Sequence, residues 1–151
     1  MIRLSILCFF ACSLTACGVR APVSQFAKST IVQSTPEAVA IEAEFEISNT
    51  NDEPLQLKNF NYTVTSGSRV LYKGLEAAQQ TVPRWSSIQC RIPIVIRRED
   101  FASNSPVAWK LIGTLAYSPP TALSQTLLKS GWWKPTMQVQ GHGAFDMPGI
   151  N

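Results

Sequence analysis

Few side chains in this sequence have the types and the spacing that catalysis requires. The chain has a single histidine, His142, and no serine stands in a Gly-x-Ser-x-Gly sequence. A hydrolytic triad needs a nucleophile, a base and a residue that orients the base. His142, flanked by two glycines, is therefore better explained as a strand residue near an edge. One histidine without a Cys-x-x-Cys pair also argues against a zinc site, so we expect no catalytic residue, no metal and no cofactor.

Three glutamates form the most regular polar pattern in the chain. Glu42, Glu44 and Glu46 alternate with apolar residues, which places them on one face of a strand at intervals of roughly 7 Å. That spacing is too wide for three carboxylates to share one cation without help. The strip is a candidate interaction surface for a cation or a partner. We favour a solvated face that pairs with arginines and lysines of neighbouring strands.

The tryptophans are the second candidate interaction surface. Trp132 and Trp133 are adjacent, and a strand sends neighbouring side chains to opposite faces, so one of the two should be exposed. Trp85 follows Pro83 and Arg84 at the start of a strand. Exposed aromatic residues beside basic ones suit a membrane interface or a partner groove. A core anchor that caps the end of the domain is an equal alternative.

The first sixteen residues have the pattern of a secretory signal. Arg3 precedes an apolar segment over residues 4–14, which is about half of the roughly 20 residues that span a bilayer. The segment that follows, residues 14–18 (LTACG), resembles the lipobox of bacterial lipoprotein precursors. The resemblance implies cleavage between Ala16 and Cys17 and a lipid on Cys17. The alternative is an ordinary secretory signal that leaves a free thiol at the new amino terminus.

The lipobox resemblance also implies a location in the cell. More than one acyl chain on Cys17 would make membrane attachment effectively permanent. Gly18, in place of an acidic residue, implies export to the outer membrane in bacteria of the enteric type. We therefore expect a lipid-anchored protein of the cell envelope, on the periplasmic face of the outer membrane. Residues 17–28, with glycine, proline and no clean periodicity, are expected to be the lipidated cysteine and its tether.

Removal of the signal also changes the cysteine content and the charge. Cys8 and Cys12 leave with the signal and Cys17 carries lipid, so Cys90 has no partner for an intramolecular disulfide. Cys90 shares its predicted strand face with isoleucines, which favours a buried and unreactive thiol. Loss of Arg3 lowers the formal net charge from +3 to +2. That charge is too small to indicate nucleic acid binding.

Period-2 alternation predicts strands through most of the mature chain. It is clearest over residues 39–51, where five apolar residues alternate with polar or small ones before a turn at residues 48–52. The predicted strands lie near residues 29–34, 39–47, 55–64, 69–75, 88–96, 107–117 and 133–145. This is one domain of 151 residues at most, and it is predicted to be all-β: an antiparallel β-sandwich of six or seven strands with one or two short helices.

Five local irregularities refine this prediction. The inward phase slips near Lys58 and Asn59, which predicts a β-bulge, and Gly74 is expected to end a short strand. Pro93 cannot donate to a ladder, so its strand should be an edge strand or bulged. Residues 97–103 could form one or two helical turns packed through Phe101. Residues 121–130 could form a short helix or a mobile loop.

The order of several short motifs resembles the late embryogenesis abundant type 2 family, also called the water-stress and hypersensitive-response domain. The resemblance covers residues 29–148, and its motifs are residues 45–51 (FEISNTN), 55–62 (LQLKNFNY), Gly74, 92–96 (IPIVI), 113–115 (GTL) and 143–145 (GAF). The family turn is Asn-Pro-Asn, whereas this chain has Asn49, Thr50 and Asn51. The resemblance implies a sandwich of fibronectin type III or immunoglobulin-like shape with a short helix, and no catalytic residues.

Two functions follow as expectations. The first is a non-enzymatic, membrane-anchored lipoprotein with a binding or protective role in envelope, desiccation or osmotic stress, as the family resemblance implies. Its exposed strand edges could pair with a client chain. The alternative is an accessory lipoprotein of an envelope assembly or secretion complex, with one specific protein partner. In both, the membrane is bound through the lipid on Cys17, and nucleic acid is not a partner.

Overall fold

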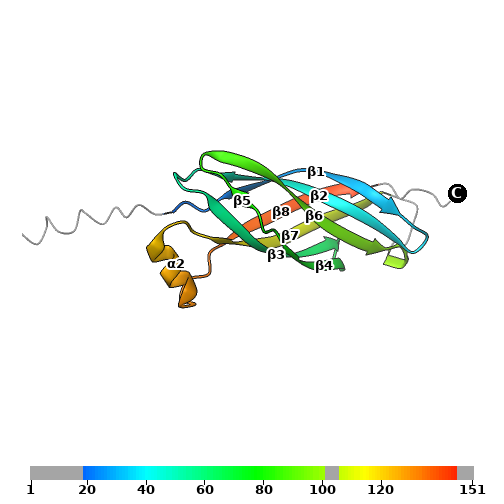
Figure 1. Cartoon of the computed structure of the whole chain (residues 1–151). Helices are drawn as coiled ribbons and strands as arrows, with labels where there is room; N and C mark the ends of the chain where they lie inside the picture. The colour runs from blue at the N-terminus through cyan, green and yellow to red at the C-terminus, as the bar shows by residue number, and fades with distance from the viewer. Residues whose placement is uncertain (1–18, 101–105, 146–151) are drawn as a thin grey trace, which may run out of the picture.

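Antiparallel strands form two facing sheets in this computed structural model, which describes residues 19–100 and 106–145 (Figure 1). The first sheet has the order β1 (Val23–Ser34), β2 (Ala38–Asn49), β6 (Ser86–Arg97). The second has the order β4 (Arg69–Ala77), β3 (Leu55–Ser66), β7 (Val107–Ser118), β8 (Thr136–Phe145). The two-residue strand β5 (Thr81–Val82) pairs with the start of β3. The predicted all-β sandwich is confirmed.

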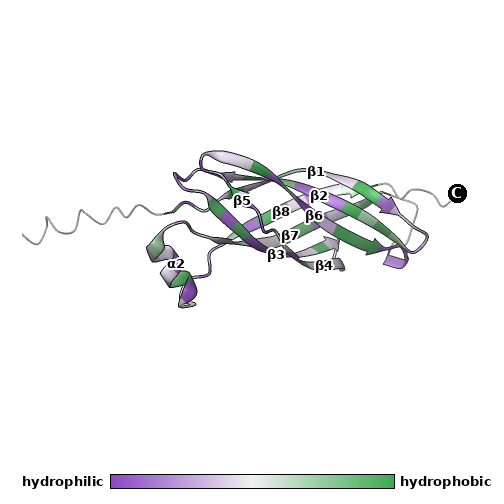
Figure 2. Ribbon diagram, viewed as in Figure 1, coloured by the Kyte–Doolittle hydropathy of each residue, from purple (hydrophilic) through white to green (hydrophobic). Residues whose placement is uncertain are grey.

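The core lies between the sheets and follows the alternation seen in the sequence. The inward residues of β2 are all buried, and they face buried residues of β3 and β7. Figure 2 shows the hydrophobic residues along the strands, whereas the turn after β6 is hydrophilic. Each fully buried aliphatic or aromatic side chain contributes roughly 1.5–3 kcal/mol relative to exposure. The buried aromatic and aliphatic side chains of the core include Val39, Phe45, Leu57, Tyr62, Trp109 and Leu115.

The first strand is longer than predicted. β1 begins at Val23, inside the segment expected to be a tether. Two register irregularities, between Phe26 and Lys28 and between Ile31 and Gln33, interrupt its alternation, so the sequence pattern is weak. Phe26 nevertheless packs edge-on against Phe45 and Trp109, with ring centroids 5.5 and 5.7 Å away. Only the chain before Val23 is left to serve as a tether.

Two predicted irregularities are present and one is absent. The pairing of β3 with β7 shifts between Leu57 and Phe60, which confirms the bulge. β6 ends the strand order of its sheet, so Pro93 does lie on an edge strand. Gly74 does not end β4, which continues to Ala77. A Cβ on Gly74 would lie 2.2 Å from the Tyr62 ring, so glycine is there to admit that ring and not to break the strand.

Tyr62 links the two sheets at this edge. Its hydroxyl donates a hydrogen bond to the carbonyl oxygen of Pro93 on β6. Burial, and then the neighbouring Tyr72 and Glu76, raise the pKa of Tyr62 well above its ordinary value. The phenol therefore stays protonated and keeps its donor at physiological pH.

Helical structure is limited in the described part of the chain. A single 3₁₀ turn, η1 (Arg98–Asp100), follows β6, while Phe101, expected to pack beneath it, lies outside the described residues. Residues 121–130, which could have been a loop, contain the helix α2 (Ala122–Lys129). The side chain of Thr121 caps α2 by accepting a hydrogen bond from the Ser124 backbone. The described ranges hold eight strands, one more than the predicted upper number, because β5 forms where the pattern is irregular.

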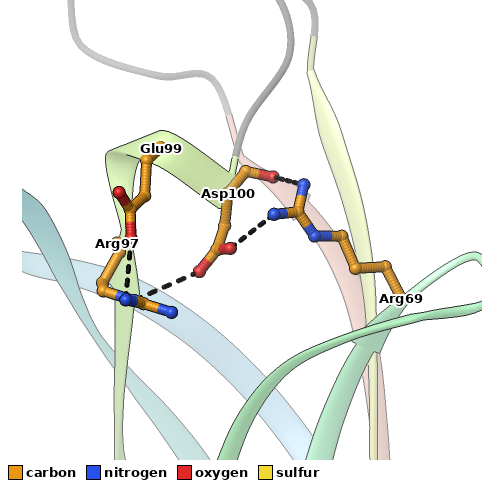
Figure 3. Close-up of polar contacts among 4 residues, drawn as sticks. All are labelled: Arg69, Arg97, Glu99 and Asp100. Atoms are coloured by element: carbon orange, nitrogen blue, oxygen red, sulfur yellow. Dashed lines mark hydrogen bonds and ion pairs between the residues drawn. The ribbon is translucent and has the colours of Figure 1, made fainter.

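Arginine side chains join the elements at the end of the sandwich that carries η1. Arg69 donates from its two terminal nitrogens to the carbonyl oxygen and the Oδ1 of Asp100, at 2.8 and 2.6 Å (Figure 3). Arg97 pairs with Glu99 at 2.7 Å and lies 3.7 Å from Asp100. Arg98 donates to the Ser34 hydroxyl and to the Thr35 carbonyl. We call this set of contacts the arginine end; it links β6, the β3–β4 hairpin and the β1–β2 turn.

Candidate functional site

The opposite end of the sandwich gathers most of the residues that the sequence singles out. The β2–β3 turn, the β5–β6 connection and α2 all lie where the described chain begins, at Val19 (Figure 1). We call it the amino-terminal end. Its turns are built from Asn, Pro, Asp and Thr, which form local side-chain bonds and set special backbone angles. The strands of both sheets hold these turns next to one another.

Asn49 is the central residue of the amino-terminal end. It is only 1% exposed, and its amide nitrogen donates to the carbonyl oxygens of Glu53 (2.8 Å), Val82 (3.2 Å) and Pro83 (3.1 Å). Its Oδ1 accepts from the backbone and side-chain nitrogens of Asn51, at 3.0 and 2.8 Å. The first of these is the local Asx turn that the sequence suggests. The bonds to Val82 and Pro83 join the β2–β3 turn to the β5–β6 connection, so one buried amide fixes two turns.

Asn51 extends this network to the start of the chain. The Arg20 backbone nitrogen donates to the Oδ1 of Asn51 at 2.8 Å, and the Nδ2 of Asn51 donates to the Arg20 carbonyl at 2.9 Å. The side-chain amide of Asn51 thus pairs with a main-chain peptide as a neighbouring strand would. We call this pair of bonds the Asn51 clamp. It fixes Arg20, three residues after Cys17, against the sandwich.

A shallow pocket of about 300 Å³ opens beside the Asn51 clamp. It is lined by the clamp itself, by acidic residues of the β2–β3 turn and by Trp85 and Thr121. Trp85 has a left-handed backbone (φ 51°), and its indole nitrogen donates to Asp52 at 3.0 Å. A left-handed conformation is uncommon for a bulky residue, and here the indole bond and the bonds of Asn49 to Pro83 hold the turn. Trp85 remains 63% exposed.

The segment after α2 carries the other exposed tryptophan. Trp132 is 89% exposed, and Trp133 is half-buried with its backbone nitrogen bonded to the carbonyl of Leu127. The final strand was expected to include Trp133, but β8 begins only at Thr136. Pro135, whose carbonyl accepts from Tyr117, directs the chain from α2 into that strand. Both tryptophans therefore belong to the loop at the amino-terminal end.

The glutamate strip of β2 makes cross-strand ion pairs. Glu44 lies between Lys28 on β1 and Arg91 on β6, at 3.9 and 3.6 Å, and Arg91 is also 3.8 Å from Glu42. Glu44 is almost fully covered, whereas Glu46 is exposed. The cross-strand ion pairs are those favoured from the sequence, whereas the burial of Glu44 departs from the solvated face that was expected. The strip lies along the sheet and does not join the amino-terminal end.

Cys90 and His142 lie apart from each other and from this end. Cys90 is buried in β6, where its thiol donates to the Gln80 side chain at 3.1 Å, and burial raises its pKa to about 11. A thiol with that pKa is protonated at neutral pH and is a poor nucleophile. His142 is exposed on β8, opposite Lys110. In residues 19–100 and 106–145, no group of three or more His, Cys, Asp or Glu could hold a metal ion.

The residues of the predicted lipobox, Ala16 and Cys17, lie outside the described residues. Within the described ranges, no helix has the length and apolar character needed to cross a membrane.

Sequence reasoning found Asn49, Asn51, Trp85 and Trp132 but missed their assembly. It assigned the asparagines to local turn chemistry, whereas four of their bonds reach Arg20, Val82 and Pro83, more than thirty residues away. No local pattern marks such partners. The Pro-Arg-Trp sequence at residues 83–85 was the one signal that could have been connected with the turn.

The chain superposes on the solution structure of a late embryogenesis abundant (LEA) protein with a TM-score of 0.67. The two are 14% identical, and the match covers 97% of this chain and 81% of the other. This chain has a LEA-like fold.

Two further structures share the LEA-like fold. A protein of Arabidopsis thaliana matches with a TM-score of 0.65 at 14% identity, over 91% of each chain. A protein from Archaeoglobus fulgidus matches with a TM-score of 0.54 at 11% identity, over 88% of this chain and all of the other. Identities this low establish the fold alone. No protein-family model matches the sequence, and no curated protein sequence matches it.

Proposed function

We propose that this chain is a non-enzymatic lipoprotein of the cell envelope, anchored by a lipid on Cys17, whose LEA-like domain binds and protects other proteins under envelope, desiccation or osmotic stress. The Asn51 clamp is the observation that carries the proposal. It fixes Arg20 to the domain by two hydrogen bonds, so the residues just before it lead directly to the predicted lipobox. A domain built this way is suited to work at a membrane surface.

The binding surfaces of the proposed function are the strand edges. In the described residues, β4 and β6 each pair on one side only, which leaves backbone donors and acceptors for a client strand. Binding through such edges needs no dedicated catalytic residue.

The first experiment tests the anchor. The full-length chain, produced in a Gram-negative host, should incorporate labelled palmitate and fractionate with membranes, and Cys17→Ala should lose the label and appear in the soluble fraction. Incorporation of labelled palmitate by Cys17→Ala would contradict the lipobox interpretation. For the stress role, deletion in the native host should lower survival after desiccation and osmotic shock, and unchanged survival would rule that role out.

A second function, an accessory lipoprotein of an envelope assembly or secretion complex, is favoured by one observation. Leu75 and Val70 on the edge strand β4 are 70% and 48% exposed, and Val95 on the edge strand β6 is 43% exposed. Exposed apolar residues on edge strands suit a dedicated partner. Crosslinking in cells followed by purification separates the two: one stoichiometric complex favours the accessory function, and many weak clients favour general protection.

A further inference from the structure

The tryptophans of this protein are concentrated at one end. Trp109 is buried in the core, while Trp85, Trp132 and Trp133 all lie in the loops of the amino-terminal end. The two exposed indoles, at 63% and 89%, are among the largest apolar groups on the described surface. Exposed tryptophans are costly in water but stable at the headgroup level of a bilayer, where the ring is apolar and its N–H finds acceptors.

The charges around these indoles suit an anionic lipid surface. Arg84 precedes Trp85 and Lys134 follows Trp133, and both basic side chains are exposed. Lys129 closes α2, and Arg20 lies at the clamp. Two acidic residues, Asp52 and Glu53, accompany these four basic ones. A basic excess beside interfacial aromatics favours binding to anionic headgroups.

The chain length fixes which end must face the membrane. Cys17 precedes Arg20 by three residues, so the extended chain reaches roughly 10 Å. Each headgroup layer of a bilayer is about 5–8 Å thick. Because the Asn51 clamp holds Arg20 on the domain, a lipid on Cys17 leaves the sandwich too little length to stand away from the surface.

We propose that the amino-terminal end docks on the phospholipid surface of the membrane that holds the anchor, with Trp85 and Trp132 in the headgroup layer. This inference rests on the proposed function, which supplies the lipid on Cys17. It adds a fixed orientation of the sandwich relative to the membrane. The strands then project from the membrane, and the arginine end and the lengths of β4 and β6 face away from it. The edge strands β4 and β6 then stay accessible to a client.

Tryptophan quenching tests this orientation. The lipidated full-length chain is reconstituted into vesicles of phosphatidylethanolamine and phosphatidylglycerol that contain brominated acyl chains. We expect the brominated lipid to quench the tryptophan emission, and the double variant Trp85→Phe, Trp132→Phe to lose most of that quenching. Trp133→Phe, which changes the half-buried neighbour, is the matched control and should keep it. Emission that brominated lipid leaves unchanged would overturn the docking.

Charge reversal gives a second readout with the unlipidated Cys17→Ala chain and free vesicles. Arg84→Glu with Lys134→Glu should weaken its binding to anionic vesicles by about tenfold or more. Lys73→Glu with Lys110→Glu makes the same charge change on exposed strand positions of β4 and β7 and should weaken binding much less. Equal losses from the two pairs would contradict a docking surface at this end.

Failure of the anchor and failure of the docking give different results. Mass spectrometry of the amino-terminal peptide shows whether Cys17 is lipidated. An anchored chain whose tryptophans are not quenched would leave the proposed function standing and refute the docking. An unmodified Cys17 in a chain that still binds vesicles through Trp85 and Trp132 would refute the anchor and support the docking.

Discussion

The two ends of the sandwich are held by different chemistry. At the amino-terminal end, the neutral amides of Asn49 and Asn51 join two turns and the start of the chain. At the arginine end, Arg69, Arg97 and Arg98 join the turns through charged groups. Exposed ion pairs weaken with salt and contribute little, whereas a buried, fully bonded amide does not depend on ionic strength. The end that we propose faces charged lipid is thus joined mainly by neutral amides, beside the bond of Trp85 to the Asp52 carboxylate.

The largest effect is expected from removing the buried amide. Asn49→Ala removes the amide donor from the carbonyl oxygens of Glu53, Val82 and Pro83 and should lower the free energy of unfolding by about 3 kcal/mol. Urea denaturation measures it, and the loss should not change with salt. Thr50→Ala, at the exposed position between the two asparagines, is the control and should change stability by less than about 0.5 kcal/mol. A loss below about 1 kcal/mol for Asn49→Ala would show that the amide does not organise this end.

The strand β6 connects the two ends, and Cys90 in its middle provides a test by pH. Burial raises the pKa of its thiol from 9.0 to about 11, so above pH 9 the unfolded chain loses this proton before the native chain does. The stabilisation is therefore complete below about pH 9 and disappears as the pH rises toward 11. Across this window, wild type should lose about 2 kcal/mol more stability than Cys90→Ala. If the free energies of unfolding of the two proteins change in parallel with pH, the thiol of Cys90 is not shielded from solvent in the native state.

At the arginine end, the key carboxylate is Asp100. Its side chain is almost fully covered, accepts a hydrogen bond from Arg69 and forms an ion pair with Arg97 at 3.7 Å, so Asp100→Ala should cost about 1–2 kcal/mol. Unlike Asn49→Ala, this loss should shrink in high salt. Glu99→Gln removes an exposed pair and should cost less than about 0.5 kcal/mol. A salt-independent loss for Asp100→Ala would abolish the contrast between the ends.

The smallest stability effect is expected at the Asn51 clamp. Asn51→Ala removes two exposed bonds to Arg20 and one bond to the Oδ1 of Asn49, which keeps its bond from the Asn51 backbone, and should lower stability by about 1 kcal/mol or less. Its effect on the start of the chain should be larger, because trypsin can then reach the bond after Arg20. We expect trypsin to remove the amino terminus faster from Asn51→Ala than from wild type, and mass spectrometry measures the two cleavage rates. Equal cleavage rates would show that Arg20 is not held by the clamp.

Local patterns predicted the fold where they were uninterrupted. Strict alternation located β2, β6 and β7, and the phase slip located the bulge at Lys58 and Asn59. The same method failed for β1, because two register irregularities hide an edge strand whose Phe26 is nonetheless packed on Trp109. It failed at Gly74 because the reason for a glycine there is the ring of Tyr62 on the adjacent strand.

The candidate site was predictable in its parts and not in its assembly. Asn49 and Asn51 were identified as turn residues and Trp85 and Trp132 as candidate exposed aromatics, but nothing in the sequence connected the asparagines with Trp85 or Arg20. Hydrogen bonds over thirty residues form only because antiparallel strands return the chain to the same end. Strand pairing also makes the glutamate strip a weaker candidate interaction surface. The strands β1 and β6 place Lys28 and Arg91 beside Glu44, so its charge is already paired.

The sequence by itself determined the class of this protein, because a period of two over several strands can bury only one face of each and therefore requires facing sheets. It also contains the linear segment, residues 14–18, whose resemblance to a lipobox is the basis of the proposed anchor. Only the tertiary structure decided that Asn51 holds Arg20, that three tryptophans share one end, and that arginines close the other. Those relations depend on where distant strands end, and that is fixed by register and topology and not by any local run of residues.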